Sequence, residues 1–180
     1  ADGTFYVTAQ AGKDKTALHT YDLATGKLSE QPLVNMVDYD FRGRLIFSNG
    51  KLIGFRALSD AETTTWFDPG MKALQDEVDK LLNNTINLIS VAPRAETPWV
   101  LVESYSDTIP KTVRLFNTKT KAFNVVGSAY PGIKPEQMGS QEAVKYTARD
   151  GLEIPALLTM PPGVEKGKAP LVVLVHGGPY

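Results

Sequence analysis

The sequence predicts a mainly β fold in two parts: partial blades of a β-propeller, followed by the first strands of an α/β sheet. Three observations support this prediction. Short strand-like segments separated by turns fill residues 4–126, a weak repeat recurs along them, and an apolar run of the kind buried in parallel sheets occupies residues 171–175. The pattern changes near Tyr130, which predicts a domain boundary there.

The repeat is centred on Tyr21, Trp66 and Phe116, which lie about 45 to 50 positions apart, a spacing typical of propeller blades. A sandwich of short strands would accommodate each strand equally well but does not explain the spacing. Asn49-Gly50 is a strong hairpin turn inside the second unit. The predicted strands are residues 4–9, 17–22, 27–34, 44–48, 51–56, 63–67, 86–91, 99–105, 112–116 and 122–126.

One helix is predicted between the second and third units, over about residues 69–82. Asp68 is a plausible N-cap and Pro69 occupies the first helical position. The apolar residues that share one face of this helix are Met71, Leu74, Val78, Leu81 and Leu82. This pattern indicates a helix packed on a blade, so we expect residues 1–130 to be the C-terminal part of a propeller with a helical insertion.

Residues 131–142 read as an interdomain linker, because Pro131-Gly132 and Pro135 interrupt the strand pattern. A single helical turn is predicted after Pro135. Apolar residues then alternate with polar ones on both sides of Asp150-Gly151, which predicts a hairpin with one buried face. The alternating residues are Val144, Tyr146, Ala148, Ile154, Ala156 and Leu158.

Composition indicates a soluble globular protein without a preference for nucleic acid or membrane surfaces. The chain is 42% hydrophobic and 22% charged, and its net charge is -1. No apolar run approaches the roughly 20 residues that span a bilayer. Because there is no cysteine, disulfides and thiolate metal sites are excluded, and a cytoplasmic or periplasmic location is left open.

The run Leu171–Val175 is expected to be a strand buried on both faces, and it leads into His176-Gly177-Gly178-Pro179. In open α/β sheets, chemistry gathers beyond the carboxyl ends of the strands. Two glycines let the backbone approach a ligand closely, so that N–H groups can point at a developing oxyanion. An ordinary turn, in which the glycines only permit the bend, is the alternative for these residues.

Together, the apolar run, the His-Gly-Gly-Pro motif and the segment Tyr146–Ile154 resemble the prolyl oligopeptidase family (S9) of serine peptidases. The resemblance is strongest to its acylaminoacyl-peptidase and dipeptidyl-aminopeptidase-like branch. It extends over nearly the whole chain but is specific only in the final forty or so residues, since propeller sequences match one another loosely. The resemblance implies a propeller placed before an α/β-hydrolase domain, which would begin within residues 143–180.

The resemblance also implies a site. It makes the backbone N–H of Gly178 the best candidate for an oxyanion donor, with Gly177 shaping the turn and His176 in the site wall rather than acting as base. No Gly-x-Ser-x-Gly motif is present, so the serine, aspartate and histidine of the catalytic triad are expected beyond Tyr180. Neither a metal nor an organic cofactor is implied, and the partners expected are a small peptide substrate and the rest of the same polypeptide.

Other candidate residues are less convincing. A packed or surface histidine explains His19 better than a metal ligand or a triad member does. Residues 48–51 match the Ser-x-x-Lys pattern of β-lactamases, but they fall on a hairpin turn. The loop acids Asp38, Asp40, Asp60 and Glu62 lack the spacing of a calcium loop. Residues 104–108 indicate local turn chemistry.

Because the chain begins with Ala1 and ends just after a buried-type strand, we expect a piece of a longer protein that is inactive alone. The activity expected of the whole is hydrolysis of peptide or acyl-peptide bonds by a serine-type peptidase. An esterase that uses the same oxyanion loop, or a non-catalytic propeller that acts as a scaffold, is the alternative. The type of peptidase and the oligomeric state, including a homo-oligomer, are left open.

Overall fold

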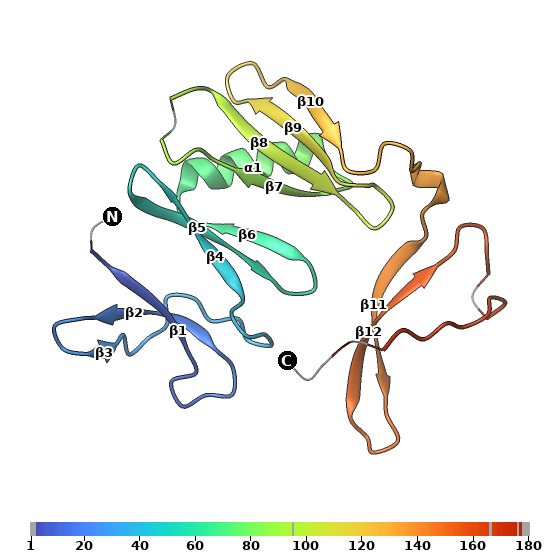
Figure 1. Ribbon diagram of the computed structural model, residues 1–180, viewed down its shortest axis with the longest axis horizontal. Helices are drawn as coiled ribbons and strands as arrows, with labels where there is room; N and C mark the ends of the chain where they lie inside the picture. The colour runs from blue at the N-terminus through green and yellow to red at the C-terminus, as the bar shows by residue number, and fades with distance from the viewer. Residues whose placement is uncertain (1–2, 95, 166, 176, 178–180) are drawn as a thin grey trace. The chain divides into compact units, whose positions relative to one another are not determined.

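The computed structural model describes residues 3–94, 96–165, 167–175 and 177. Of these residues, 42% lie in strands and 9% in helices, and none of the sheets closes into a barrel. The prediction of a mainly β chain is confirmed. The strands form several small antiparallel sheets in two compact units (Figure 1). Unit 1 comprises residues 1–106 and 111–129, and unit 2 comprises residues 107–110 and 130–180.

The first sheet of unit 1 contains β1 (Phe5–Ala9), β2 (Ala17–Asp22) and β3 (Lys27–Leu28), in that order. The turn before β3 is held by Asp22, whose Oδ1 accepts a hydrogen bond of 2.8 Å from the Ala24 N–H. The third strand was predicted to reach residue 34 but ends at Leu28. Pro32 lies in the missing stretch and has no N–H to donate, so only an isolated bridge between Leu18 and Val34 continues the ladder.

The second sheet contains β4 (Gly43–Ser48), β5 (Lys51–Leu58) and β6 (Glu62–Trp66), again in chain order. Asn49 and Gly50 join β4 to β5 with positive φ angles of 50° and 74°, as a two-residue type I′ turn requires. Gly54 is needed where it lies, because a Cβ there would come within 2.6 Å of the Thr65 carbonyl oxygen. The positive φ angles at Asn49-Gly50 and the pairing of β4 with β5 confirm the predicted hairpin.

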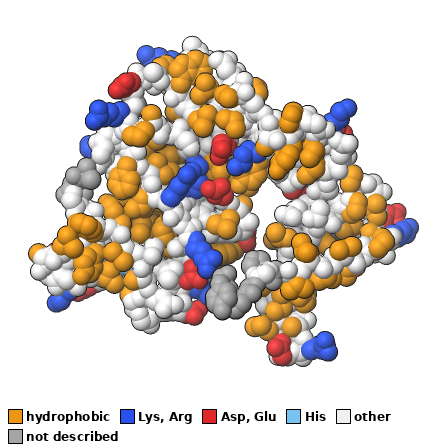
Figure 2. All heavy atoms as spheres, in the orientation of Figure 1, with side chains coloured by type: hydrophobic (Ala, Val, Ile, Leu, Met, Phe, Trp, Pro, Cys, Tyr) orange, Lys and Arg blue, Asp and Glu red, His pale blue; other side chains and the backbone are white. Residues whose placement is uncertain are grey.

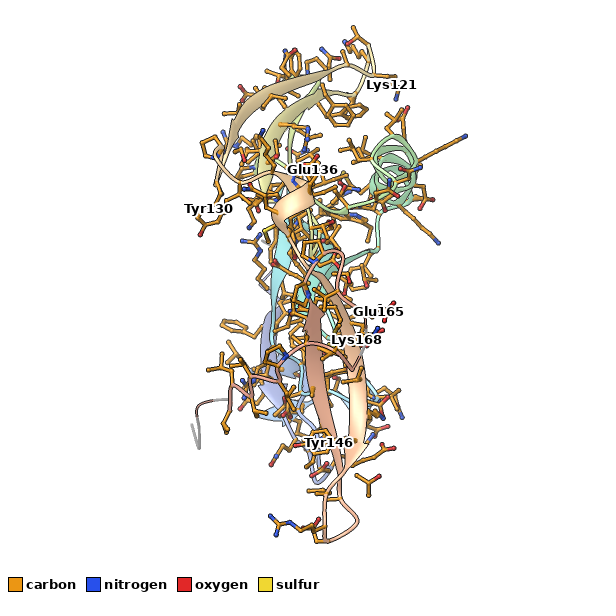
Figure 3. All side chains as sticks on the ribbon, turned by 90° about the vertical axis from the view of Figure 1, so that its right-hand side faces the viewer. Lys121, Tyr130, Glu136, Tyr146, Glu165 and Lys168 are labelled. Carbon is orange, nitrogen blue, oxygen red and sulfur yellow. The ribbon has the colours of Figure 1, made fainter. Side chains whose placement is uncertain are left out.

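The third sheet is a four-stranded meander made of β7 (Ile86–Ser90), β8 (Trp99–Tyr105), β9 (Thr112–Asn117) and β10 (Phe123–Ser128). Helix α1 (Pro69–Leu81) lies beside β7 (Figure 1). The turn between β9 and β10 is tied to the helix by an ion pair of 2.6 Å between Lys121 Nζ and Glu77 Oε2. Lys121 is labelled in Figure 3.

Helix α1 begins as predicted, with the Asp68 side chain accepting a hydrogen bond from the Met71 N–H. Its apolar face packs into a cluster formed by Trp66, Val78, Ile89, Val102 and Phe116. Of the five apolar residues predicted to share that face, only Leu81 is absent from the packing, and it is 51% exposed. Leu81 is the last helical residue and lies at the edge of the apolar stripe, so packing there was wrongly predicted.

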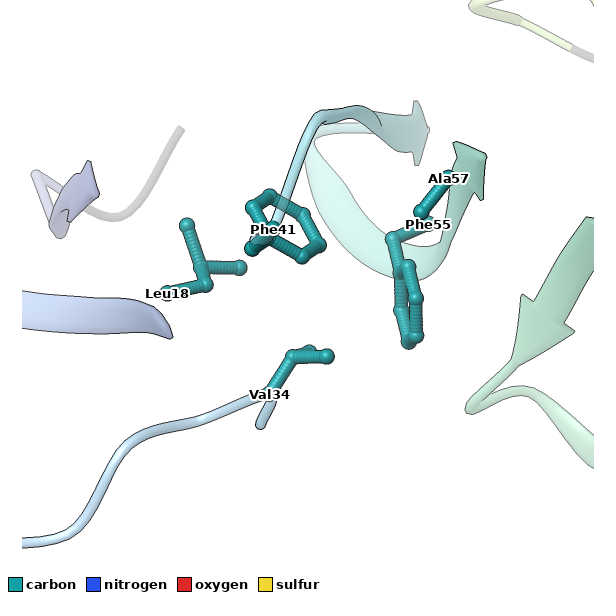
Figure 4. Packing of buried hydrophobic residues seen from close by; sticks show 5 residues of the cluster. All are labelled: Leu18, Val34, Phe41, Phe55 and Ala57. Carbon is teal, nitrogen blue, oxygen red and sulfur yellow. The ribbon is translucent and has the colours of Figure 1, made fainter. Parts of the chain in front are cut away.

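A second apolar cluster joins the first two sheets of unit 1. Its buried members are Leu18, Val34, Phe41, Phe55 and Ala57 (Figure 4). The rings of Phe41 and Phe55 are tilted against each other with centroids 5.7 Å apart. Each neighbouring pair of sheets in unit 1 is therefore held together by its own apolar contacts.

Unit 2 is built around the hairpin of β11 (Ser140–Thr147) and β12 (Glu153–Met160). The predicted hairpin is confirmed, and its alternating residues share one face, since Val144 pairs with Ala156 and Tyr146 pairs with Ile154. The predicted buried face is only half-buried, and Tyr146 is 57% exposed (Figure 3). The short helix η1 (Pro135–Gln137) precedes the hairpin, as the sequence predicted.

The apolar run Leu171–Val175 differs from its prediction. These five residues form no strand, and between 72% and 95% of each is exposed. A strand needs partners for its backbone N–H and C=O groups, and the sheet of unit 2 contains only β11 and β12 among the described residues. The run is therefore not a buried strand in this structure.

No helix among the described residues is long and apolar enough to cross a membrane.

Candidate functional site

The predicted oxyanion loop is only partly described. Gly177 is exposed, and a Cβ added to it would meet nothing within 4 Å. His176, Gly178, Pro179 and Tyr180 lie outside the described residues. The roles predicted for His176, Gly177 and Gly178 therefore stay predictions.

The candidates that the sequence disfavoured have ordinary structural roles. His19 is 4% exposed on β2, and its Nδ1 lies 3.0 Å from the carbonyl oxygen of Ser29, so it is a packed histidine. Ser48 and Lys51 flank the turn between β4 and β5. His19 is thus explained by packing on β2, and the Ser-x-x-Lys match is explained by the hairpin turn.

Two of the predicted loop acids, Asp40 and Asp60, accept hydrogen bonds from other segments, and Glu62 lies not in a loop but at the start of β6. Asp40 Oδ1 accepts bonds from the N–H and the hydroxyl of Thr16, and these bonds lower the pKa of the Asp40 carboxyl. Asp60 accepts a bond of 2.5 Å from the Tyr39 hydroxyl. No group of three or more histidine or acidic side chains among the described residues could hold a metal ion.

The structure brings together one charged cluster that the sequence did not reveal, which we name the Arg56 cluster. It combines side chains from the second and third sheets of unit 1 around a buried guanidinium. Its members are Arg44, Arg56, Glu62, Glu103, Tyr105 and Lys111. Positive and negative side chains gather in the middle of one face of unit 1 (Figure 2).

Arg56 itself lies on β5 and is only 2% exposed. Its Nε donates a bond of 2.9 Å to the Thr64 hydroxyl on the neighbouring strand β6. Its Nη2 donates a bond of 2.7 Å to the Ile89 carbonyl oxygen on β7. Because β7 is an edge strand, the guanidinium satisfies a carbonyl group that the sheet leaves unpaired and clamps the two sheets together.

The remaining terminal nitrogen of Arg56, Nη1, is buried and has no hydrogen-bond partner among the described residues. Burial lowers the pKa of Arg56 first, and the positive charge of Arg44 lowers it further, whereas Glu62 and Glu103 raise it. An arginine nevertheless stays protonated in a protein, so the cluster contains a buried positive charge with a free donor.

Three groups at the rim of the cluster are partly exposed. Lys111 Nζ lies 3.7 Å from Glu103 Oε2 and 5.4 Å from the centroid of the Tyr105 ring. Burial raises the pKa of Tyr105, and the charge of Glu62 acts in the same direction. The phenol is therefore a neutral hydroxyl group at physiological pH. The cluster can offer guanidinium, ammonium and hydroxyl donors to a ligand.

One sequence signal could have led to this cluster. Arg56 stands in an apolar strand, and Arg44 precedes it in a strand joined by a two-residue turn. Counting back from that turn places Arg44 opposite Phe55, one position away from Arg56. A bulge between Ile46 and Phe47 shifts the register in the structure, so that Arg44 pairs directly with Arg56. Two like charges in that position destabilise a sheet unless something offsets them.

Unit 2 contains a separate open depression of about 390 Å³, lined mainly by apolar groups. Its lining residues include Met138, Met160 and Val164. Beside it, Asp107 Oδ2 accepts a bond of 2.8 Å from the Gln141 N–H at the start of β11, and Asp107 Oδ1 accepts one from the Thr108 N–H. The local turn chemistry predicted for residues 104–108 is confirmed at Asp107.

By fold, the chain belongs to the class of mainly β proteins built from several small antiparallel sheets. No family model matches it. The chain is similar to dipeptidyl aminopeptidase BIII of Pseudoxanthomonas mexicana, with 25% identity over an alignment of 188 positions. The alignment takes in 98% of this chain and 26% of that enzyme, so the chain spans about a quarter of the length of this curated relative. This similarity is compatible with the peptidase family that the sequence motifs resemble.

Proposed function

We propose that the chain is part of a serine peptidase that hydrolyses peptide or acyl-peptide bonds of small peptides. The observation that carries the proposal is the similarity to a dipeptidyl aminopeptidase, which extends over 98% of the chain. The His-Gly-Gly-Pro motif at residues 176–179 also supports it, because a loop of this type supplies one oxyanion donor in α/β-hydrolases.

The proposed reaction proceeds through an acyl-enzyme. A serine beyond residue 180 attacks the scissile carbonyl carbon, a histidine takes the serine proton, and the carbonyl oxygen becomes an oxyanion. The Gly178 N–H donates a hydrogen bond to that oxyanion. When the intermediate collapses, the histidine returns the proton to the leaving amine, and water then releases the acyl group by the same steps in reverse.

We propose residues 1–130 as part of a propeller that covers the active site and restricts access to small peptides. The sheets of unit 1 support this, since each is a meander in chain order and neighbouring sheets pack through apolar clusters. Residues 131–142 would be the linker, and residues 143–180 the start of the catalytic domain.

The first test is labelling of the full-length protein with a fluorophosphonate, followed by peptide mapping. A single adduct on a serine that follows residue 180 is expected. The absence of an adduct on a folded protein would favour a non-catalytic scaffold, and an adduct within residues 1–180 would contradict the proposed placement. A labelled protein that cleaves esters but no peptides would be an esterase.

The oxyanion role is tested by Gly178→Pro, which removes the donor N–H. Losing one such donor is expected to lower kcat by about 100-fold or more while KM changes little. Gly132→Ala is the control, because a Cβ at Gly132 would meet nothing within 4 Å. An unchanged kcat in Gly178→Pro would remove Gly178 from the site.

A further inference from the structure

The Arg56 cluster holds an unused hydrogen-bond donor at its centre. Arg56 is 2% exposed, yet Nη1 has no partner among the described residues, whereas Nε and Nη2 are both bonded. Leaving a buried charged donor unpaired destabilises a protein, because the group has lost its hydration and gained no partner. The two existing bonds explain why an arginine clamps these sheets, but they do not explain the free nitrogen.

The second unusual feature is the pair formed by Arg44 and Arg56. They are directly opposite each other on β4 and β5, so their side chains leave the same face of the sheet. A guanidinium is a planar fork that matches a carboxylate, and two of them on one face can bind the same anion. The like-charge pair becomes favourable as soon as an anion lies between its members.

The groups around Arg56 are more exposed than Arg56 itself, so an anion reaches Nη1 only when their side chains move. Arg44 is exposed, and Glu62, Glu103 and Tyr105 are each partly exposed. The Glu103–Lys111 pair is 3.7 Å long and open to solvent, so it contributes little to stability and its side chains rearrange readily. With three cationic and two acidic side chains, the cluster has a formal charge of +1.

We propose that Arg44 and Arg56 form a binding site for the carboxylate group of a peptide ligand. The choice of a peptide rests on the proposed function, whereas the preference for a carboxylate follows from the cluster itself. Arg44 and Nη1 of Arg56 bind the two carboxylate oxygens. The neutral Tyr105 hydroxyl and Lys111 belong to the same cluster and are further donors. The carboxylate comes either from the C-terminus of a peptide or from an acidic side chain.

The test is calorimetric titration of the full-length protein with three small probes. N-acetylglycine carries a terminal carboxylate, N-acetylglycinamide has the same shape without the charge, and the α-amide of N-acetylaspartic acid carries a side-chain carboxylate. We expect at least one acid to bind about tenfold more tightly than N-acetylglycinamide, as one charge-assisted bond allows. The tighter of the two acids identifies the source of the carboxylate.

Arg44→Gln is the decisive variant, because Arg44 is exposed and its loss leaves the Arg56 clamp in place. It is expected to reduce the preference for the acid to within about twofold, and Arg44→Lys is expected to restore it in part. Arg42→Gln removes an equal charge two residues away and is the matched control. It is expected to keep the full preference.

Two results would overturn the proposal. One is a wild-type protein that binds neither acid more tightly than the amide, and the other is an Arg44→Gln variant that keeps the preference shown by Arg42→Gln. In either case the cluster is only a clamp between sheets. The readout is binding, so it is independent of fluorophosphonate labelling, and failure of the peptidase proposal would leave a carboxylate site that could still be measured.

Discussion

The two units of the chain differ in what holds them together. In unit 1, side chains from three sheets and a helix are buried in two apolar clusters, and several of them are fully enclosed. In unit 2, no described residue is buried, although its strands are longer than most of those in unit 1. The comparison shows that strand pairing alone does not make a core, because a two-stranded hairpin has nothing to bury its apolar face against.

The largest effect expected from this difference concerns Phe116 and Leu157. Phe116 is fully buried in unit 1, and Phe116→Ala should lower the free energy of unfolding by about 3–5 kcal/mol. Leu157 is 65% exposed on β12, and Leu157→Ala should change the free energy of unfolding by less than about 0.5 kcal/mol. Urea unfolding followed by tryptophan fluorescence measures the first change, since Trp66 and Trp99 both lie in unit 1.

For Leu157→Ala, hydrogen exchange at the amides of β12 is the suitable measurement, because no tryptophan lies in unit 2. Unchanged exchange is expected. Strongly accelerated exchange in the full-length protein would show that this face of the hairpin is covered there, and the comparison between the units would then no longer hold.

A smaller effect on the free energy of unfolding is expected at the start of α1. The described part of unit 2 contains no α-helix that corresponds to it. Asp68→Ala removes the acceptor for the Met71 N–H and should cost about 1 kcal/mol, measured by urea unfolding. Asp76→Ala, on the exposed part of the same helix, is the control and should cost less. An equal loss in both variants would mean that charge, rather than capping, sets the stability of the helix end.

The smallest effect is a dependence on pH. The Thr16 N–H and hydroxyl lower the pKa of Asp40 in the folded state, so Asp40 contributes stability above its unfolded pKa of about 3.9. That contribution is lost as the pH falls through the folded pKa. Asp40→Asn keeps an acceptor without the charge, so its melting temperature should vary less with pH between about pH 5 and pH 2. Parallel curves for wild type and variant would contradict this.

How much the sequence predicted depends on how local the cause is. The turns at Asn49-Gly50 and Asp150-Gly151 and the cap at Asp68 are set by neighbouring residues, and the structure has all three where they were predicted. The early end of β3 follows from Pro32. The prediction extended the strand to residue 34 because it gave the apolar pattern more weight than the proline. Such errors come from giving one local signal too much weight.

Features that depend on distant residues could not be predicted in this way. The Arg56 cluster joins β5 to β7, whose contacting residues are 33 positions apart, and no pattern within one strand indicates that contact. The run Leu171–Val175 shows the reverse problem, because its composition is that of a buried strand and its surroundings in the described residues do not bury it. Burial is decided by partners, and a sequence pattern shows only which residues are suited to it.

The bond between Asp107 and Gln141 has a consequence for the order of folding. It joins residues 34 positions apart, and the chain between them includes the whole of β9 and β10. Both strands therefore leave the ribosome before Gln141 does, so the third sheet can be complete when this bond forms. The loop closed by the bond then contains mostly ordered chain, which reduces the entropy lost on closing it. We expect Asp107 to take its native place late, after the sheet from which its loop projects.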